Sequence, residues 1–149
     1  MPNFHFPQLN SPEFLVIYWT VLAVAVLFLL VERWKLMTKL YLEGWKSLIP
    51  IYGEFLLWQH TWSGGFYFLH LLFSVAGSVL LQVAGGNIGL LLGALLCFLV
   101  ALCLYARKCL HTARAFGHGA MFALGLLLFP GFFDGILAFS FDPYIGNVS

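Results

Sequence analysis

The stretch FLVIYWTVLAVAVLFLLV, residues 14–31, decides the class of this chain. It has 18 residues and no charge, which is close to the length of helix that crosses a hydrocarbon core of about 30 Å. Three more apolar runs follow, at about 66–83, 88–105 and 120–141. The sequence therefore predicts an all-α membrane protein, a single transmembrane domain over residues 1–149 built as a four-helix bundle.

The composition of the chain agrees with a surface that mostly faces lipid. Of the 149 residues, 62% are hydrophobic and only 9% are charged, whereas an average soluble domain has roughly 25% charged residues. No basic block is long enough to suggest nucleic acid as a partner. The lipid bilayer is the first partner that the sequence predicts.

The basic residues are placed asymmetrically. All seven fall between apolar runs, which we interpret as two loops: Arg33, Lys35, Lys39 and Lys46 in the first, and Arg107, Lys108 and Arg114 in the second. Membrane proteins keep such residues on the cytoplasmic side. The pattern predicts a multi-pass protein of the bacterial inner membrane with both termini outside. The first twelve residues lack Lys and Arg, so we expect the first run to be a retained span.

The segment from about 45 to 62 is the hardest to place. Its apolar part is short for a span and contains Glu54, and Trp45, Trp58 and Trp62 suit the headgroup region. We expect an interfacial helix, with a re-entrant piece as the alternative. A fifth span would put three of the seven basic residues outside, so the charge pattern disfavours it.

Asp134 is the strongest candidate site residue, because an ionisable group at membrane depth is costly and commonly functional. Pro130 precedes it and predicts a kink. Gly131 and Gly135 flank it and permit close approach of a neighbouring helix. No Lys or Arg lies within a predicted span, so the expected partner of Asp134 is His, Tyr, a backbone dipole, another subunit or a bound cation. The alternative is a wet carboxylate near the interface.

Two further ionisable residues are candidates for an ion or polar site. Glu54 either belongs to such a site or faces water and pairs with Lys46 or Lys39. His70, early in the second span, either titrates near the cytoplasmic face or bonds a neighbouring hydroxyl or carbonyl.

Small residues indicate where helices pack. Gly89 and Gly93 lie on one face of the third span, and Ser74 and Ser78 lie on one face of the second. Small residues four apart let membrane helices approach closely. We expect the second and third spans to pack through these positions.

The residues predict no catalytic centre, metal site or cofactor. The three cysteines form no CxxC pair, the histidines show no metal-binding spacing, and no GxSxG motif occurs. These patterns do not favour an enzyme, although they leave the question open.

Two segments repeat a short pattern. SLIPIYGEFLLW (47–58) and LLFPGFFDGILA (127–138) each contain proline, then an aromatic residue, then an acid, two positions apart. The acids are Glu54 and Asp134. Broken segments in matching positions are one indication of a transporter site.

GWKSLIPIYG (44–53), followed by ARAFGHGAMFALGLLLFPGFFDGILAF (113–139) and YIG (144–146), resembles a family of small four-span bacterial and archaeal membrane proteins. The module is also similar to the membrane domain that precedes the catalytic part of some signal peptidase I proteins. Gly53 stands where the family usually has Asn, and the peptidase's serine–lysine domain is absent from this sequence. The resemblance implies a membrane module and no enzymatic activity.

The sequence favours a non-enzymatic function, as an accessory or scaffold subunit of a bacterial inner-membrane assembly. Its partners would be other membrane protein subunits or a second copy of the chain. The first alternative is a small oligomeric transporter or channel that uses Asp134 and Glu54. The second is a membrane-embedded enzyme or a lipid-binding protein.

Overall fold

The computed structural model describes residues 12–146, which form helices and turns without a β-strand. In chain order the elements are α1 (Pro12–Lys39), the 3-10 helix η1 (Gly44–Leu48), α2 (Pro50–Thr61), α3 (Gly64–Val83), α4 (Ile88–Ala115), α5 (Ala120–Leu128) and α6 (Pro130–Phe139). The predicted all-α membrane class is confirmed. Within the described range, α1, α3 and α4 are long and apolar enough to cross a membrane.

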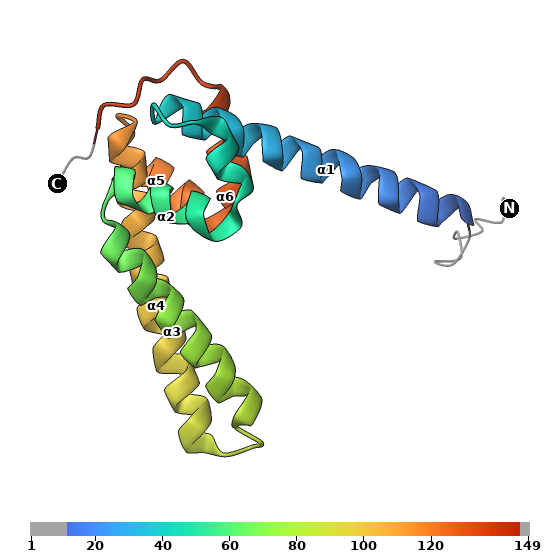
Figure 1. Ribbon diagram of the computed structural model, residues 1–149. Coiled ribbons are helices and arrows are strands. Elements are labelled where there is room, and N and C mark those ends of the chain that lie inside the picture. The colour runs from blue at the N-terminus through green and yellow to red at the C-terminus, as the bar shows by residue number, and fades with distance from the viewer. Residues whose placement is uncertain (1–11, 147–149) are drawn as a thin grey trace, which may run out of the picture.

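The long helices leave one common end of the molecule in two directions. Figure 1 shows α3 and α4 side by side as a hairpin, while α1 leads away separately toward the N-terminus. The hairpin turns at residues 84–87, where Gly85 and Gly86 adopt the positive φ angles of 49° and 90° that glycine tolerates best. The Asn87 side chain then caps α4 by accepting the N–H of Gly89 at 2.9 Å.

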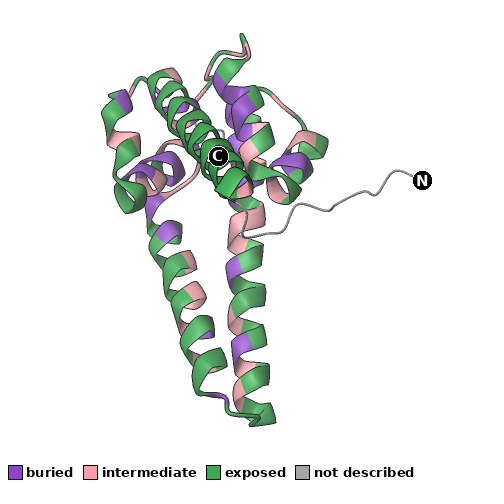
Figure 2. Cartoon of the chain, turned by 90° about the vertical axis from the view of Figure 1, so that its right-hand side faces the viewer, coloured by how far each residue is buried: buried purple, intermediate pink, exposed green. Residues whose placement is uncertain are grey.

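The core lies where the elements meet, at that common end, as the buried residues in Figure 2 show. The C-terminal parts of α1 and α4 pack there against α2, α5 and α6. The cluster includes Leu36, Leu57, Ala113, Leu126 and Leu137, all at most 2% exposed. The far parts of α1 and of the hairpin remain mostly exposed, as expected for helices that face lipid.

The basic residues lie on helices, so the prediction of two basic loops is wrong. Arg33, Lys35 and Lys39 belong to the last turns of α1, and Lys46 belongs to η1. The other three belong to the last turns of α4. Arg and Lys are good helix formers, so a helix need not stop where its apolar run stops.

The fourth apolar run, predicted as one span, is divided. Phe129 leaves the helical conformation (φ −134°, ψ 65°), and Pro130 starts α6 as its first residue. The predicted kink is therefore a complete break. The ring of Phe133 packs onto Gly125, where no side chain would fit. The N–H of Ile145 donates to the carbonyl oxygen of Ala115 at 2.8 Å, so α5 leads away from the end of α4 and α6 returns to it.

The predicted small-residue contact between the second and third spans lies elsewhere along the hairpin. A Cβ atom on Gly93 would meet Leu80 at an ordinary 3.6 Å, and one on Gly89 would meet only Asn87. The close approach is at Gly77, where a Cβ would lie 3.2 Å from the Phe98 ring. Ser78 donates to the carbonyl oxygen of Ser74 in its own helix.

We expect Gly77→Ala to be about 1 kcal/mol less stable in detergent than Gly93→Ala, the low end of overpacking costs. Gly93→Ala is the matched control, because it brings the same gain in helix propensity without a tight contact. If both variants melt together, α3 and α4 do not meet closely at Gly77.

Candidate functional site: a buried charge cluster

Five ionisable side chains from four helices form one group at the common end of the molecule, which we call the charge cluster. Its members are Glu32 and Arg33 of α1, Glu54 of α2, Lys108 of α4 and Asp134 of α6. Glu32 lies seven residues before Lys39, which corresponds to about 10 Å along the helix. The cluster is therefore deeper than the basic ends of α1 and α4.

Arg33 connects two acids that are 80 positions apart in the sequence. Its guanidinium forms an ion pair with Glu54, and its Nη2 lies 4.0 Å from Oδ2 of Asp134. Both sequence expectations about partners are therefore wrong. Asp134 has an arginine within the same chain beside it, and Glu54 pairs with neither Lys46 nor Lys39. The reason is that α1 continues as a helix past its apolar run and turns Arg33 toward α2 and α6.

Asp134 is buried within the protein, at 2% exposure, so its carboxyl group does not face solvent. Gly131 and Gly135 lie on the side of α6 that meets α1: Cβ atoms there would be 3.7 Å from Leu29 and 3.7 Å from Phe28. The glycines beside Asp134 thus border the helix that carries Arg33.

Glu32 belongs to the cluster although the sequence did not single it out. It is 1% exposed, and within the described residues neither of its carboxyl oxygens has a hydrogen-bond partner. Because Glu32 comes directly after the apolar run, its position suggested the membrane surface. Helical spacing was the available signal, since Glu32 lies one turn before Leu36 and shares its buried face.

Lys108 contributes the second positive charge of the cluster. The sequence did not predict this role either, because Lys108 follows the end of an apolar run. It is 3% exposed, and its Nζ lies 5.5 Å from the centre of the Tyr105 ring. Burial alone would raise the pKa of Glu54, but the positive charges of Lys108 and Arg33 outweigh it and lower that pKa. Glu54 is therefore held as a carboxylate.

His70 sits beside the cluster and joins two helices. Its Nδ1 donates to the carbonyl oxygen of Ala101 at 3.0 Å, which links α3 to α4. Its ring stacks on Trp58, with 5.3 Å between ring centres. Of the two roles considered for His70, titration or a hydrogen bond to a neighbouring group, the structure shows the hydrogen bond.

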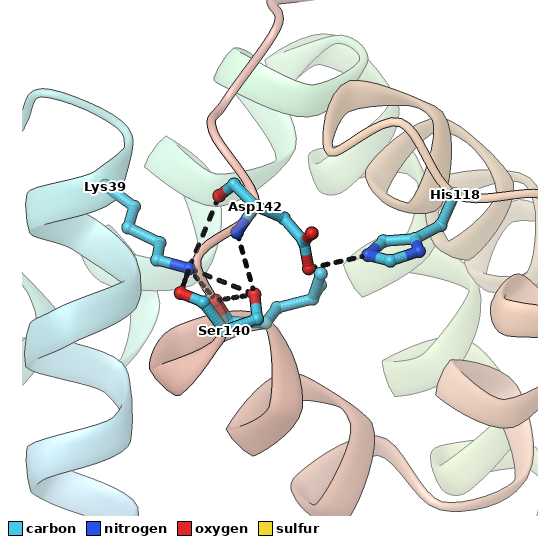
Figure 3. A network of polar contacts seen from close by, with 5 residues as sticks. Lys39, His118, Ser140 and Asp142 are labelled. Carbon is cyan, nitrogen blue, oxygen red and sulfur yellow. Dashed lines mark hydrogen bonds and ion pairs between the residues drawn. The ribbon is translucent and has the colours of Figure 1, made fainter.

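A second polar network fastens the C-terminal segment, residues 140–146, to the basic end (Figure 3). Lys39 donates to the carbonyl oxygens of Ser140 at 2.7 Å and of Leu137, at the C-terminal end of α6 where carbonyls lack helical partners. His118 pairs with Asp142 at 3.1 Å. Hydrogen bonds with the Ser140 and His118 side chains lower the pKa of Asp142. This network holds the return of α6 in place.

We expect Lys39→Met to destabilise the protein by about 1.5 to 3 kcal/mol, the range for hydrogen bonds to charged groups. Amide hydrogen exchange should accelerate at Ile145, whose N–H bonds to Ala115. Lys35→Met is the control, since Lys35 is on the same helix and only overlies the Phe139 ring. Equal exchange at Ile145 in the two variants would contradict the anchoring role of Lys39.

Comparison with known proteins gives no relative: no protein-family model, curated protein or solved structure matches the chain.

Proposed function

We propose that the protein moves protons or cations through the membrane, as a small transporter or channel. One observation carries this proposal: three acids and two bases meet deep among apolar helices, and Glu32, Lys108 and Asp134 are each at most 3% exposed. Ionisable residues at membrane depth are expensive and commonly mark ion pathways or proton relays. The sequence favoured an accessory subunit, whereas the charge cluster favours the transporter or channel.

A groove gives access to the cluster. It has a volume of about 260 Å³ and is lined by residues of α1, η1 and α2, among them Arg33, Ser47 and Glu54. The Arg33 and Glu54 side chains are 34% and 32% exposed, whereas Asp134 behind them is buried. An ion that enters the groove would meet the Arg33–Glu54 pair first and the deeper carboxyl groups next.

The proposed topology has three spans, α1, α3 and α4, with α5 and α6 as a re-entrant pair. The nine residues of α5 extend about 14 Å, half of the hydrocarbon thickness. The basic ends of α1 and α4 would face the cytoplasm of a bacterial cell. The bond between Ile145 and Ala115 favours a C-terminal segment on that same side, unlike the outward position expected from four spans. The N-terminal residues 1–11 and residues 147–149 lie outside the described range.

Single cysteines in a Cys-free background test this topology with an impermeant reagent in intact cells. We expect Asn87→Cys to be labelled from outside. Thr38→Cys and Phe141→Cys should be labelled only after the membrane is opened, because both residues are exposed at the basic end. Labelling of Phe141→Cys in intact cells would restore the four-span topology with an outward C-terminus.

Purified protein in liposomes with an internal pH-sensitive dye tests the transport function. We expect proton or cation flux above that of empty liposomes, and Asp134→Asn should abolish it because the charge beside Arg33 is lost. Glu13→Gln, an exposed carboxylate at the far end of α1, is the control and should keep the flux. Wild-type liposomes that leak no faster than empty ones would reject the proposal.

The accessory-subunit function is kept as a second proposal because of α1. The most apolar 18 residues of this helix are entirely unburied in the monomer. A membrane partner or a second copy would find an open apolar face there. The resemblance to the small four-span family is compatible with either proposal.

A further inference from the structure

The charges of the cluster do not balance. Three acids, Glu32, Glu54 and Asp134, face two bases, Arg33 and Lys108. If all five were ionised, one negative charge would remain without a counter-charge among apolar helices. A buried carboxylate in that situation takes up a proton or a cation instead.

The excess charge is located at Glu32. Arg33 is engaged by Glu54 and Asp134, and Lys108 acts on Glu54. Glu32 is 1% exposed, and both of its oxygens lack a hydrogen-bond partner in the described part of the chain. One oxygen of Asp134, Oδ1, is also buried without a partner. Two unsatisfied carboxyl groups at one site are the expected setting for a shared proton.

The backbone of α6 makes room for the Glu32 carboxyl beside Asp134. A Cβ on Gly135 would lie 3.8 Å from Oε2 of Glu32, so a glycine follows Asp134 where the Glu32 side chain reaches α6. Asp134 is also the residue whose negative charge acts most strongly on Glu32.

The other titratable groups around the pair are on every neighbouring helix except α5. Arg33 of α1 lies beside both acids, and the negative charge of Asp134 acts on Tyr105 and Cys109 of α4. Glu54 of α2 pairs with Arg33, and Lys108 of α4 and His70 of α3 act electrostatically on Glu54. The α5 segment, AMFALGLLL, has no titratable side chain.

We propose that Glu32 and Asp134 form a proton-binding pair, in which one carboxyl group carries the proton and donates it in a hydrogen bond to the other. The proton would satisfy the unpartnered oxygens and cancel the excess charge. A metal ion suits the site less well, because no group of three or more His, Cys, Asp or Glu side chains within residues 12–146 is arranged to hold one. The proton-binding pair does not depend on the proposed function. Only the further statement that the proton is the transported ion rests on that function.

Infrared spectroscopy of the purified protein at neutral pH tests the pair. We expect a C=O stretching band of a buried protonated carboxyl group that shifts in D₂O and disappears in Glu32→Gln. Glu13→Gln is the matched control and should keep the band. The Glu32→Gln variant should fold, because glutamine resembles protonated glutamate in shape and charge. We also expect the stability of the wild type to decline as pH rises, because alkali forces the proton off the pair, and we expect no such decline in Glu32→Gln.

The outcomes separate this inference from the proposed function. The band in the wild type and its loss in Glu32→Gln support the pair, whether or not liposomes show flux. Absence of the band from the wild type at neutral pH overturns it, and flux could still be measured. If the band is present in choline buffer and abolished by Na⁺, the site binds a metal cation in competition with the proton, and the assignment of the proton as the transported ion is wrong. Should Glu32→Gln fail to fold, the wild-type band and its alkaline titration still decide the matter.

Discussion

The ion pairing of Arg33 is the interaction on which the arrangement of the common end depends. A guanidinium among apolar helices is tolerated only when carboxylates lie close to it, and Arg33 has Glu54 and Asp134 as its neighbours. These acids belong to α2 and α6, so a single side chain of α1 fixes the positions of two short helices. Apolar packing around Leu36, Leu57 and Leu137 closes the same junction. Removing either acid would take away one of the two carboxylates beside Arg33, whereas the apolar contacts could adjust.

The two short helices that meet Arg33 have the same local construction. Each begins with proline as its first residue, Pro50 in α2 and Pro130 in α6. Each carries its acid four residues later, which is one helical turn, so the acid projects from the same place relative to the break. The repeated pattern found in the sequence thus places two acids, Glu54 and Asp134, beside the same base, Arg33. Whether the two segments share an origin or arose separately, the common requirement is an acid held near a helix start in an apolar setting.

The sequence predicted the helical class and the three long helices, and it singled out Asp134 and Glu54 of the charge cluster, because long apolar runs and isolated charges are strong local signals. It missed Glu32 and Lys108, because a charge at the end of an apolar run resembles a residue at the membrane surface. The missing information is where a helix ends. The helices α1 and α4 are each 28 residues long, so they extend beyond their apolar runs and bring Glu32 and Lys108 into the buried common end. It also predicted one span at 120–141, because composition does not distinguish a kink at Pro130 from a full reversal. The partner of Asp134 was not predictable, since the pairing joins distant segments.

The divergence of α1 from the α3–α4 hairpin leaves a broad junction at one end of the molecule and two separate arms beyond it (Figure 1). At the common end, parts of α1 and α4 pack together with α2, α5 and α6, whereas beyond it α1 and the hairpin extend in different directions (Figure 1). If the basic end lies at one membrane face, as in the proposed topology, the protein takes up more area in that leaflet than in the other. Lipids would then fill the space between α1 and the hairpin, and the protein would favour membrane in which the leaflet that holds the common end is the convex one. Local curvature and lipid shape therefore become variables that act on where this protein sits.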